Sequence, residues 1–176
     1  LSGADLTDAD LTGARCTKAD FTDAVLRGAT LSEAVLTRAT LRRAILTRAT
    51  LTEAALLKTD LTGADFYEAT LDEATLTDAV LDQTNLVDVD LSTTNADEFD
   101  TARPIRRDSL DPDTDLSNVS LPGVDLSGTD LSGSDLSGST LTGATLTDCD
   151  LSDADLSGAT LQEADLTDTT LVGADI

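Results

Sequence analysis

Residues 29–41 read ATLSEAVLTRATL, and the spacing of the leucines in this stretch decides the fold. Leucine recurs at every fifth residue, with alanine two positions before it. Between Leu1 and Leu91 the nineteen leucine positions hold sixteen Leu, two Phe and Cys16, and between Leu116 and Leu171 all twelve hold Leu. Internal repeats this regular determine the architecture, so they are considered before any other feature.

A period of five fits neither regular secondary structure. Residues five apart in an α-helix are separated by about 140° around the axis, so the leucines would spiral over every face. In a continuous strand, an odd spacing sends successive leucines to opposite faces. The chain must therefore turn once in every quintet. The Leu and the Ala two residues before it then point inward, and the other three residues point outward.

The outward residues support a turn after each leucine. The first residue after the leucine is mostly Ser or Thr, and the next is often Gly, Asp or Glu. Glycine tolerates the positive φ that some tight turns require. If each corner is close to a right angle, four quintets close a coil of twenty residues, and successive coils stack about 4.8 Å apart.

Three stretches carry a resemblance to a known family. ADLTDADLTGA (residues 4–14), ATLSEAVLTRATL and ADLSGATLQEADL (residues 154–166) resemble pentapeptide-repeat proteins, whose consensus is A-(D/N)-L-x-x. The resemblance covers residues 1–95 and 114–176. It implies an all-β fold, a right-handed quadrilateral β-helix with four pentapeptides per coil and about eight coils. The handedness comes from the resemblance alone.

The repeat predicts one solenoid domain in three parts. Residues 1–95 form the N-terminal coils, residues 96–113 an irregular insertion or loop, and residues 114–176 the C-terminal coils of the same domain. The middle part is either an irregular coil, with Ile105 or Leu110 filling the core, or a loop that projects from the wall. Functional residues often lie on loops of rigid scaffolds. Its arginines are therefore candidate contact residues: Arg103, Arg106 and Arg107.

The charge is strongly negative. The chain carries 34 acidic and 11 basic residues, a net charge of −23. Many aspartates and few lysines are typical of proteins adapted to high salt, which is the leading interpretation. The alternative is DNA mimicry: family members that inhibit or protect gyrase resemble a DNA duplex in width and charge, and carboxylates along a rod would compete for a phosphate-binding groove of a type II topoisomerase.

Basic residues concentrate in the N-terminal part, and residues 111–176 contain none. Within the N-terminal part they form a band with few acidic residues, which is a candidate contact for a protein partner or for the acidic half of another copy. The arginines proposed for this interface are Arg38, Arg42, Arg43 and Arg48.

Outward apolar residues form two groups. Val25 and Ile45, with Tyr67 nearby, make the candidate interface for self-association, because exposed apolar surface on a soluble protein often marks a contact. β-propensity alone is the competing explanation. Val35, Ala55 and Leu57 form a second group on another side of the coil.

Residues twenty apart should stack in columns. One column is a ladder of carboxylates, which we call the aspartate ladder: Asp115, Asp135, Asp155 and Asp175. Stacked like charges favour cations or high salt, so this column is a candidate site for weak Ca²⁺ or Mg²⁺ binding.

Catalytic chemistry finds little support. The chain has no His, and Cys16 and Cys149 occupy core positions of the repeat, where they act as small hydrophobic residues. No cofactor motif, direct nucleic-acid binding or membrane-spanning segment is expected. We therefore predict a non-enzymatic scaffold or protein-interaction module that is cytoplasmic and can form homo-oligomers. The sequence starts without Met and stops within a repeat, so we expect a fragment of a longer chain.

Overall fold

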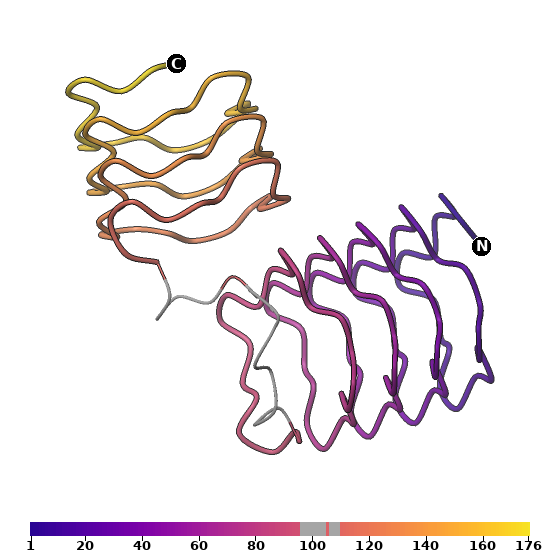
Figure 1. Ribbon diagram of the computed structural model, residues 1–176. Coiled ribbons are helices and arrows are strands. Elements are labelled where there is room, and N and C mark those ends of the chain that lie inside the picture. Colours follow the sequence, from indigo (N-terminus) through magenta and orange to yellow (C-terminus); the bar gives the residue numbers. More distant parts are fainter. Residues whose placement is uncertain (96–104, 106–109) are drawn as a thin grey trace. The chain divides into compact units, whose positions relative to one another are not determined.

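Each part of the molecule is a stack of coils (Figure 1). The computed structural model describes residues 1–95, 105 and 110–176. It divides into two compact units, Leu1–Pro104 and Ile105–Ile176. The described residues form no helix and no extended strand. Their regular structure consists of isolated parallel bridges, each joining residues twenty apart, such as Val25 to Ile45. One coil therefore takes four quintets, as the repeat predicts.

The leucine and alanine positions form the core of each unit. Leu26, Ala29 and Leu31 are completely buried, and so is Leu131 in the second unit. The intervening bridge residue and the two residues after the leucine point outward. The predicted division of each quintet into inward and outward positions is confirmed, and it explains how chains of mostly small and aliphatic side chains fill so narrow an interior.

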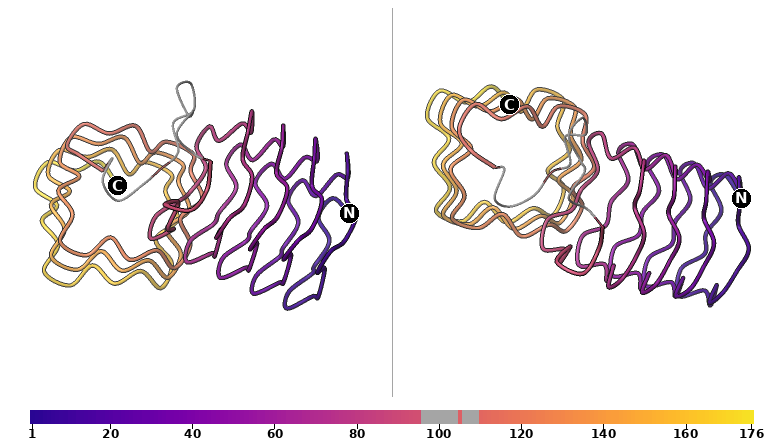
Figure 2. Two further views of the ribbon diagram at one scale, coloured as in Figure 1. Left: turned by 90° about the horizontal axis from the view of Figure 1, so that it is seen from below. Right: turned by 60° about the horizontal axis from the view of Figure 1, so that its bottom comes forward.

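A tight turn follows each leucine and makes a corner of the coil, and these corners superpose in successive coils (Figure 2). In the first turn, Ala4 N donates to Leu1 O at 3.0 Å. The third residue of these turns has positive φ, except in the turn of residues 91–94, and this fits a type II turn. All eleven glycines lie at this position, together with twenty other residues. This backbone conformation is sterically strained for a residue with a Cβ, so the stacking of the coils must impose it.

Most backbone N–H groups of the inner coils have a definite partner. In most quintets of the inner coils three N–H groups donate to neighbouring coils, and a fourth closes the turn. The remaining N–H, on the residue after the leucine, binds an Asp or Asn side chain where one stands two residues earlier. In residues 61–65 the pairs are Leu61 to Val80 O (2.8 Å), Thr62 to Asp60 Oδ1 (3.1 Å), Gly63 to Asp82 O (2.8 Å), Ala64 to Leu61 O (2.9 Å) and Asp65 to Ala44 O (2.9 Å).

Polar residues at inward positions follow a second rule. Thr59 donates its hydroxyl to Leu36 O at 2.9 Å, and Thr84 donates to Leu61 O at 2.9 Å. Both acceptors lie 23 residues earlier, in the preceding coil. Burying a hydroxyl that forms such a hydrogen bond reduces the stability of the fold little, whereas burying one without a partner is strongly destabilising. Ser139 is the exception among the described residues, because its buried hydroxyl has no partner.

The connection between the units lies mostly outside the described residues. Ile105 and Leu110 are buried, at 6% and 7% exposure. The choice between an irregular coil and a projecting loop concerns residues 96–104 and 106–109, which the structure does not describe. The assignment of both units to one continuous domain remains a prediction.

Two serines of the second unit provide a matched test of the inward positions. Ser139→Ala removes a buried, unpartnered hydroxyl and restores the common residue of the repeat, so we expect the free energy of unfolding to rise by about 1 kcal/mol. Ser134→Ala should lower it by about 1 kcal/mol, because the Ser134 hydroxyl accepts a hydrogen bond from Thr114 N at 3.1 Å. Denaturant unfolding followed by circular dichroism measures both. Equal effects of the two substitutions would contradict this account.

Candidate interaction surfaces

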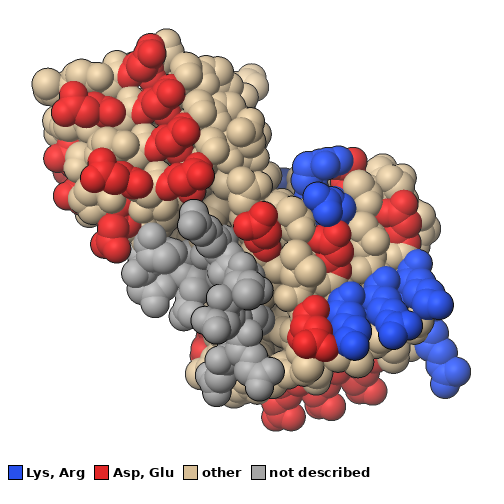
Figure 3. All heavy atoms as spheres, in the orientation of Figure 1, with Lys and Arg blue, Asp and Glu red and all other residues tan. Residues whose placement is uncertain are grey.

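The outward residues of the stacked coils form rows with a step of twenty residues. Turn residues make the edges of each unit and bridge residues make its sides. Two edges of the N-terminal unit have a uniform charge over three coils. We call them the cationic edge (Lys18, Arg38, Lys58) and the glutamate edge (Glu33, Glu53, Glu73). Figure 3 shows basic side chains in a row on the N-terminal unit, whereas all charged side chains in view on the C-terminal unit are acidic.

The four arginines proposed as an interface do not form one band. Arg38, Arg43 and Arg48 occupy three successive turns of one coil, so they lie on three different edges. Arg43 binds Asp23 through two hydrogen bonds of 2.7 and 2.8 Å, and Arg48 pairs with Glu68. The arginines of the predicted basic band are therefore spread over three edges, and their role as an interface remains a prediction. Of the four, Arg38 alone has no ion pair within the described part of the chain.

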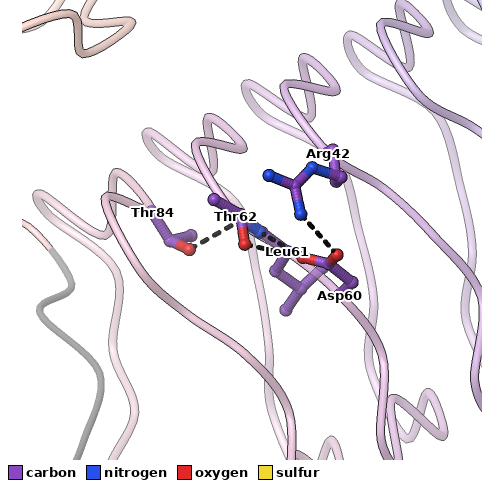
Figure 4. Close-up of polar contacts among 5 residues, drawn as sticks. All are labelled: Arg42, Asp60, Leu61, Thr62 and Thr84. Atoms are coloured by element: carbon purple, nitrogen blue, oxygen red, sulfur yellow. Dashed lines mark hydrogen bonds and ion pairs between the residues drawn. The ribbon is translucent and has the colours of Figure 1, made fainter.

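Arg42 belongs to a small polar cluster (Figure 4). Its guanidinium lies 2.9 Å from Asp60 Oδ2, while Asp60 Oδ1 accepts hydrogen bonds from the backbone N and the hydroxyl of Thr62. Partial burial of Asp60 opposes its ionisation, but the bonds from Thr62 and the charge of Arg42 outweigh this and hold its pKa below the ordinary value. Arg42 thus forms its ion pair within its own chain.

The apolar group around Val25 and Ile45 is only partly available to a partner. These two side chains are half-buried, but Tyr67 is 7% exposed. The prediction that Tyr67 contributes to an exposed interface is therefore wrong. The phase of the repeat gives the direction in which a side chain leaves the coil, but it does not give the solvent access of that side chain.

Next to Tyr67 lies a buried polar network that the sequence did not reveal. Asp65 Oδ1 accepts hydrogen bonds from Tyr67 N at 3.1 Å and from Asn85 Nδ2 at 2.8 Å, and Asp65 Oδ2 accepts one from the Thr47 hydroxyl at 2.9 Å. Burial raises the pKa of Asp65, although these hydrogen bonds and the charge of Arg27 act in the opposite direction. The stacking of Asp65 under Asn85, twenty residues later, was the one available signal.

Three residues of the aspartate ladder, Asp115, Asp135 and Asp155, accept hydrogen bonds within their turns. Ser137 donates from its backbone N and its hydroxyl to Asp135 Oδ1, at 2.9 and 2.6 Å. The equivalent bonds from Ser157 lower the pKa of Asp155. The four carboxylates lie one per coil, and no group of three or more His, Cys, Asp or Glu side chains in the described residues is arranged to hold a metal ion. Cation binding by the ladder remains a prediction without a converging set of ligands.

The other predicted site residues are placed as follows. Arg103, Arg106 and Arg107 lie outside the described residues. Cys149 is buried and donates to Leu126 O at 2.8 Å, whereas Cys16 is half-buried. Burial raises the pKa of both thiols, which disfavours the reactive thiolate. Within the described residues, the structure contains no helix that could span a membrane.

A family comparison agrees with this geometry. The model of pentapeptide repeats matches residues 1–28, 29–66, 59–95, 113–148 and 149–176. The chain belongs to the pentapeptide repeat family. Membership implies a right-handed quadrilateral β-helix. A comparison with curated proteins finds no match.

Solved structures of several pentapeptide repeat proteins are similar. HetL from Nostoc sp. strain PCC 7120, involved in heterocyst differentiation regulation, is 29% identical, over 98% of this chain and 87% of HetL, with a TM-score of 0.30. Rfr23 from Cyanothece 51142 is 23% identical, over 74% of this chain and 63% of Rfr23, with a TM-score of 0.31. QnrB1, a plasmid-mediated fluoroquinolone resistance protein, is 18% identical over 99% of this chain and 89% of its own, with a TM-score of 0.33.

The buried Asp65 gives a prediction for pH dependence. Because its pKa is raised in the folded protein, its contribution to stability is complete below the unfolded pKa of about 3.9 and is lost as the pH rises through the folded pKa. Asp65→Asn keeps an acceptor for Tyr67 N and removes the charge. We expect this variant to be more stable than the wild type at pH 7 and to lose that advantage near pH 3.

Asp60→Asn is the matched control. The pKa of Asp60 is lowered, so its contribution to stability is present above the unfolded pKa and is lost as the pH falls. We expect this variant to be less stable than the wild type at pH 7, with a smaller difference in acid. Denaturant unfolding of both variants at pH 7 and pH 3 measures the two trends, and parallel trends would contradict the assignment.

The aspartate ladder gives a prediction for salt dependence. Asp135 is bridged to Asp115 on one side and Asp155 on the other, so Asp135→Asn relieves two repulsions. Asp165 has the same hydrogen bonds, from Thr167, but its bridge partner in the preceding coil is Thr145. At low salt we expect Asp135→Asn to be more stable than Asp165→Asn. The difference should vanish near 1 M NaCl, where the screening length is about 3 Å. A difference that persists at that salt concentration would exclude charge repulsion as its cause.

Proposed function

We propose that this chain is a non-enzymatic, salt-adapted scaffold that binds proteins through rows of outward side chains. The observation that carries the proposal is the separation of roles within the quintet. Backbone pairing and the Leu–Ala core maintain the fold, while the outward turn position holds Gly, Asp, Glu, Gln, Asn, Lys or Arg with nearly the same φ. The fold thus tolerates many different side chains at its outward positions, as in other solenoids that bind along an extended surface.

The arrangement of charge supports a binding role. Two edges of the N-terminal unit, the glutamate edge and the cationic edge, each carry charges of one sign over three coils. Separate rows of charge give orientation and partner choice at an interface. The absence of His from the sequence and the raised pKa of both thiols leave no evident nucleophile and base pair.

The salt adaptation rests on the exposed carboxylates. Stacked aspartates, as in the aspartate ladder, repel one another unless cations screen them. The same carboxylates accept hydrogen bonds from turn residues, so replacing them would remove a contact that stabilises the turn.

Side-specific binding tests the scaffold. The purified chain would be immobilised, and the proteins retained from a lysate of its source organism would be compared among variants. Thr30→Lys with Thr50→Lys alters one side of the N-terminal unit, and Val25→Lys with Ile45→Lys alters another. We expect at least one retained protein to be lost with one variant and kept with the other. The same retained set for both variants would indicate non-specific attraction to an acidic protein and would refute the proposal.

A second candidate function is DNA mimicry towards a type II topoisomerase. The observation in its favour comes from residues 111–176, whose charged side chains are all acidic. Some of these aspartates are stacked one coil apart, as in the aspartate ladder. A gyrase supercoiling assay at matched salt tests it. Inhibition or protection should appear at micromolar protein and should weaken when Asp135 and Asp155 are both replaced by Asn. Unchanged supercoiling would remove this candidate.

A further inference from the structure

One side of the N-terminal unit differs from the other three. Its outward bridge residues are Arg15, Val35, Ala55 and Thr75, linked in succession by parallel bridges. Within residues 1–95 it is the only side without a carboxylate at these positions, and half-buried Leu57 adjoins it at the next turn. We call it the apolar side. On a protein of net charge −23, a side whose centre lacks acidic residues is unusual.

The two edges that border the apolar side carry opposite charges. The glutamate edge precedes its bridge residues in each coil, and the cationic edge follows them. All six edge side chains are exposed. Arg43 and Arg48 pair with carboxylates in neighbouring coils. Glu33, Glu53, Lys18 and Arg38, in contrast, form no ion pair in the described part of the chain, and Lys58 lies 3.6 Å from Asp78. The two edges are a full side apart, so they do not neutralise each other within one chain.

We propose that the apolar side binds the apolar side of a second copy of this chain, around a two-fold axis parallel to the coil axis. A rotation about that axis exchanges the two edges, so the glutamate edge of each copy faces the cationic edge of the other. A two-fold axis across the coils would instead place glutamate against glutamate. The charges therefore select the parallel arrangement, and such a contact is closed and self-complementary.

The register of the edges fits this arrangement. Glu33 and Arg38 are five residues apart, a quarter of a coil, which corresponds to a step of about 1.2 Å along the axis at the usual spacing of strands. Glu33 therefore meets Arg38 of the second copy, and Glu53 meets Lys58 of the second copy. Symmetry doubles both pairs. Val35 and Ala55 lie at the centre of the side and contact their own counterparts near the axis.

The complementarity ends at the next coil. Glu73 would face Asp78 of the second copy, and Lys18 would face Gly13 of the second copy, so only two levels of the edges are matched. A contact limited to these coils is smaller than the interface of a permanent dimer, and we expect a weak dimer, detectable at roughly 100 µM chain. This inference deepens the proposed function, because it assigns one binding surface of the scaffold to a second copy.

Charge reversal at the edges gives the decisive experiment. The glutamate-edge variant carries Glu33→Lys and Glu53→Lys, and the cationic-edge variant carries Arg38→Glu and Lys58→Glu. All four positions are turn residues with φ between 56° and 59°, where the repeat accepts Glu, Lys and Arg alike, so folding should be retained. Sedimentation equilibrium of the full chain in about 0.15 M NaCl, where charges beyond roughly 8 Å are screened, measures the association.

We expect the wild type to dimerise and each variant alone to associate at least about tenfold more weakly, because like charges then face each other. An equimolar mixture of the two variants should form a heterodimer, since one has basic and the other acidic residues on both edges. Glu73→Lys is the control on the same edge. It should strengthen the dimer, because the substitution places a positive charge opposite Asp78 of the second copy, where two carboxylates would otherwise face each other.

Three results would overturn the proposal. They are a wild type that stays monomeric at every concentration, a dimer that tolerates both sets of substitutions, and a dimer that is lost only with the cationic-edge variant. The last result would mean that the cationic edge binds carboxylates other than those of the glutamate edge. None of these results decides the scaffold function, which the retention experiment tests with changes on two other sides. Conversely, an intact dimer without specific retained proteins would refute the wider scaffold alone.

Discussion

The structure depends on hydrogen bonding between peptide groups of successive coils. In most quintets of the inner coils three N–H groups donate to a neighbouring coil and a fourth closes the corner. No single quintet can satisfy its own backbone, and an unpaired buried peptide group is costly. This pairing fixes the twenty-residue coil, holds the third turn residue at positive φ even where it is Arg or Glu, and directs the Leu and Ala side chains into one interior.

The same constraint explains part of the acidity. The N–H of the residue after each leucine has no backbone partner, and the carboxylate two residues earlier accepts its hydrogen bond, as Asp60 does for Thr62 and Asp135 does for Ser137. An aspartate at this position therefore stabilises the turn, but the twenty-residue step then stacks it beside other aspartates. Salt lowers the cost of the stacking and leaves the hydrogen bond in place. The turn hydrogen bonds and the proposed salt adaptation thus concern the same residues.

Much of this architecture could be predicted from sequence, because the period of five is incompatible with a helix or a continuous strand. The turn in each quintet and the inward Leu and Ala positions follow from that period, whereas the coil of twenty residues needed the further assumption of right-angled corners. Simple arithmetic would also have found Arg43 beside Asp23, since both occupy one column. Arg42 and Asp60 are eighteen residues apart, and their contact depends on how two side chains cross an edge. The burial of Tyr67 and Asp65 was not predictable, because the repeat specifies direction and not what limits solvent access.

Some outward residues of the N-terminal unit do not contribute to the stability of the fold, and their presence needs another explanation. Val35 and Ala55 occupy positions where an aspartate would have accepted a turn hydrogen bond, as Asp60 does on the adjacent side, so their quintets lack this contact. Lys18, Arg38 and Lys58 stack like charges at a turn position that uncharged glycine fills at eleven other places in the chain. Neither feature is explained by the stability of a single copy. Carboxylates supplied from outside at the same one-coil pitch would offset the repulsion along the cationic edge, and the glutamate edge has that pitch.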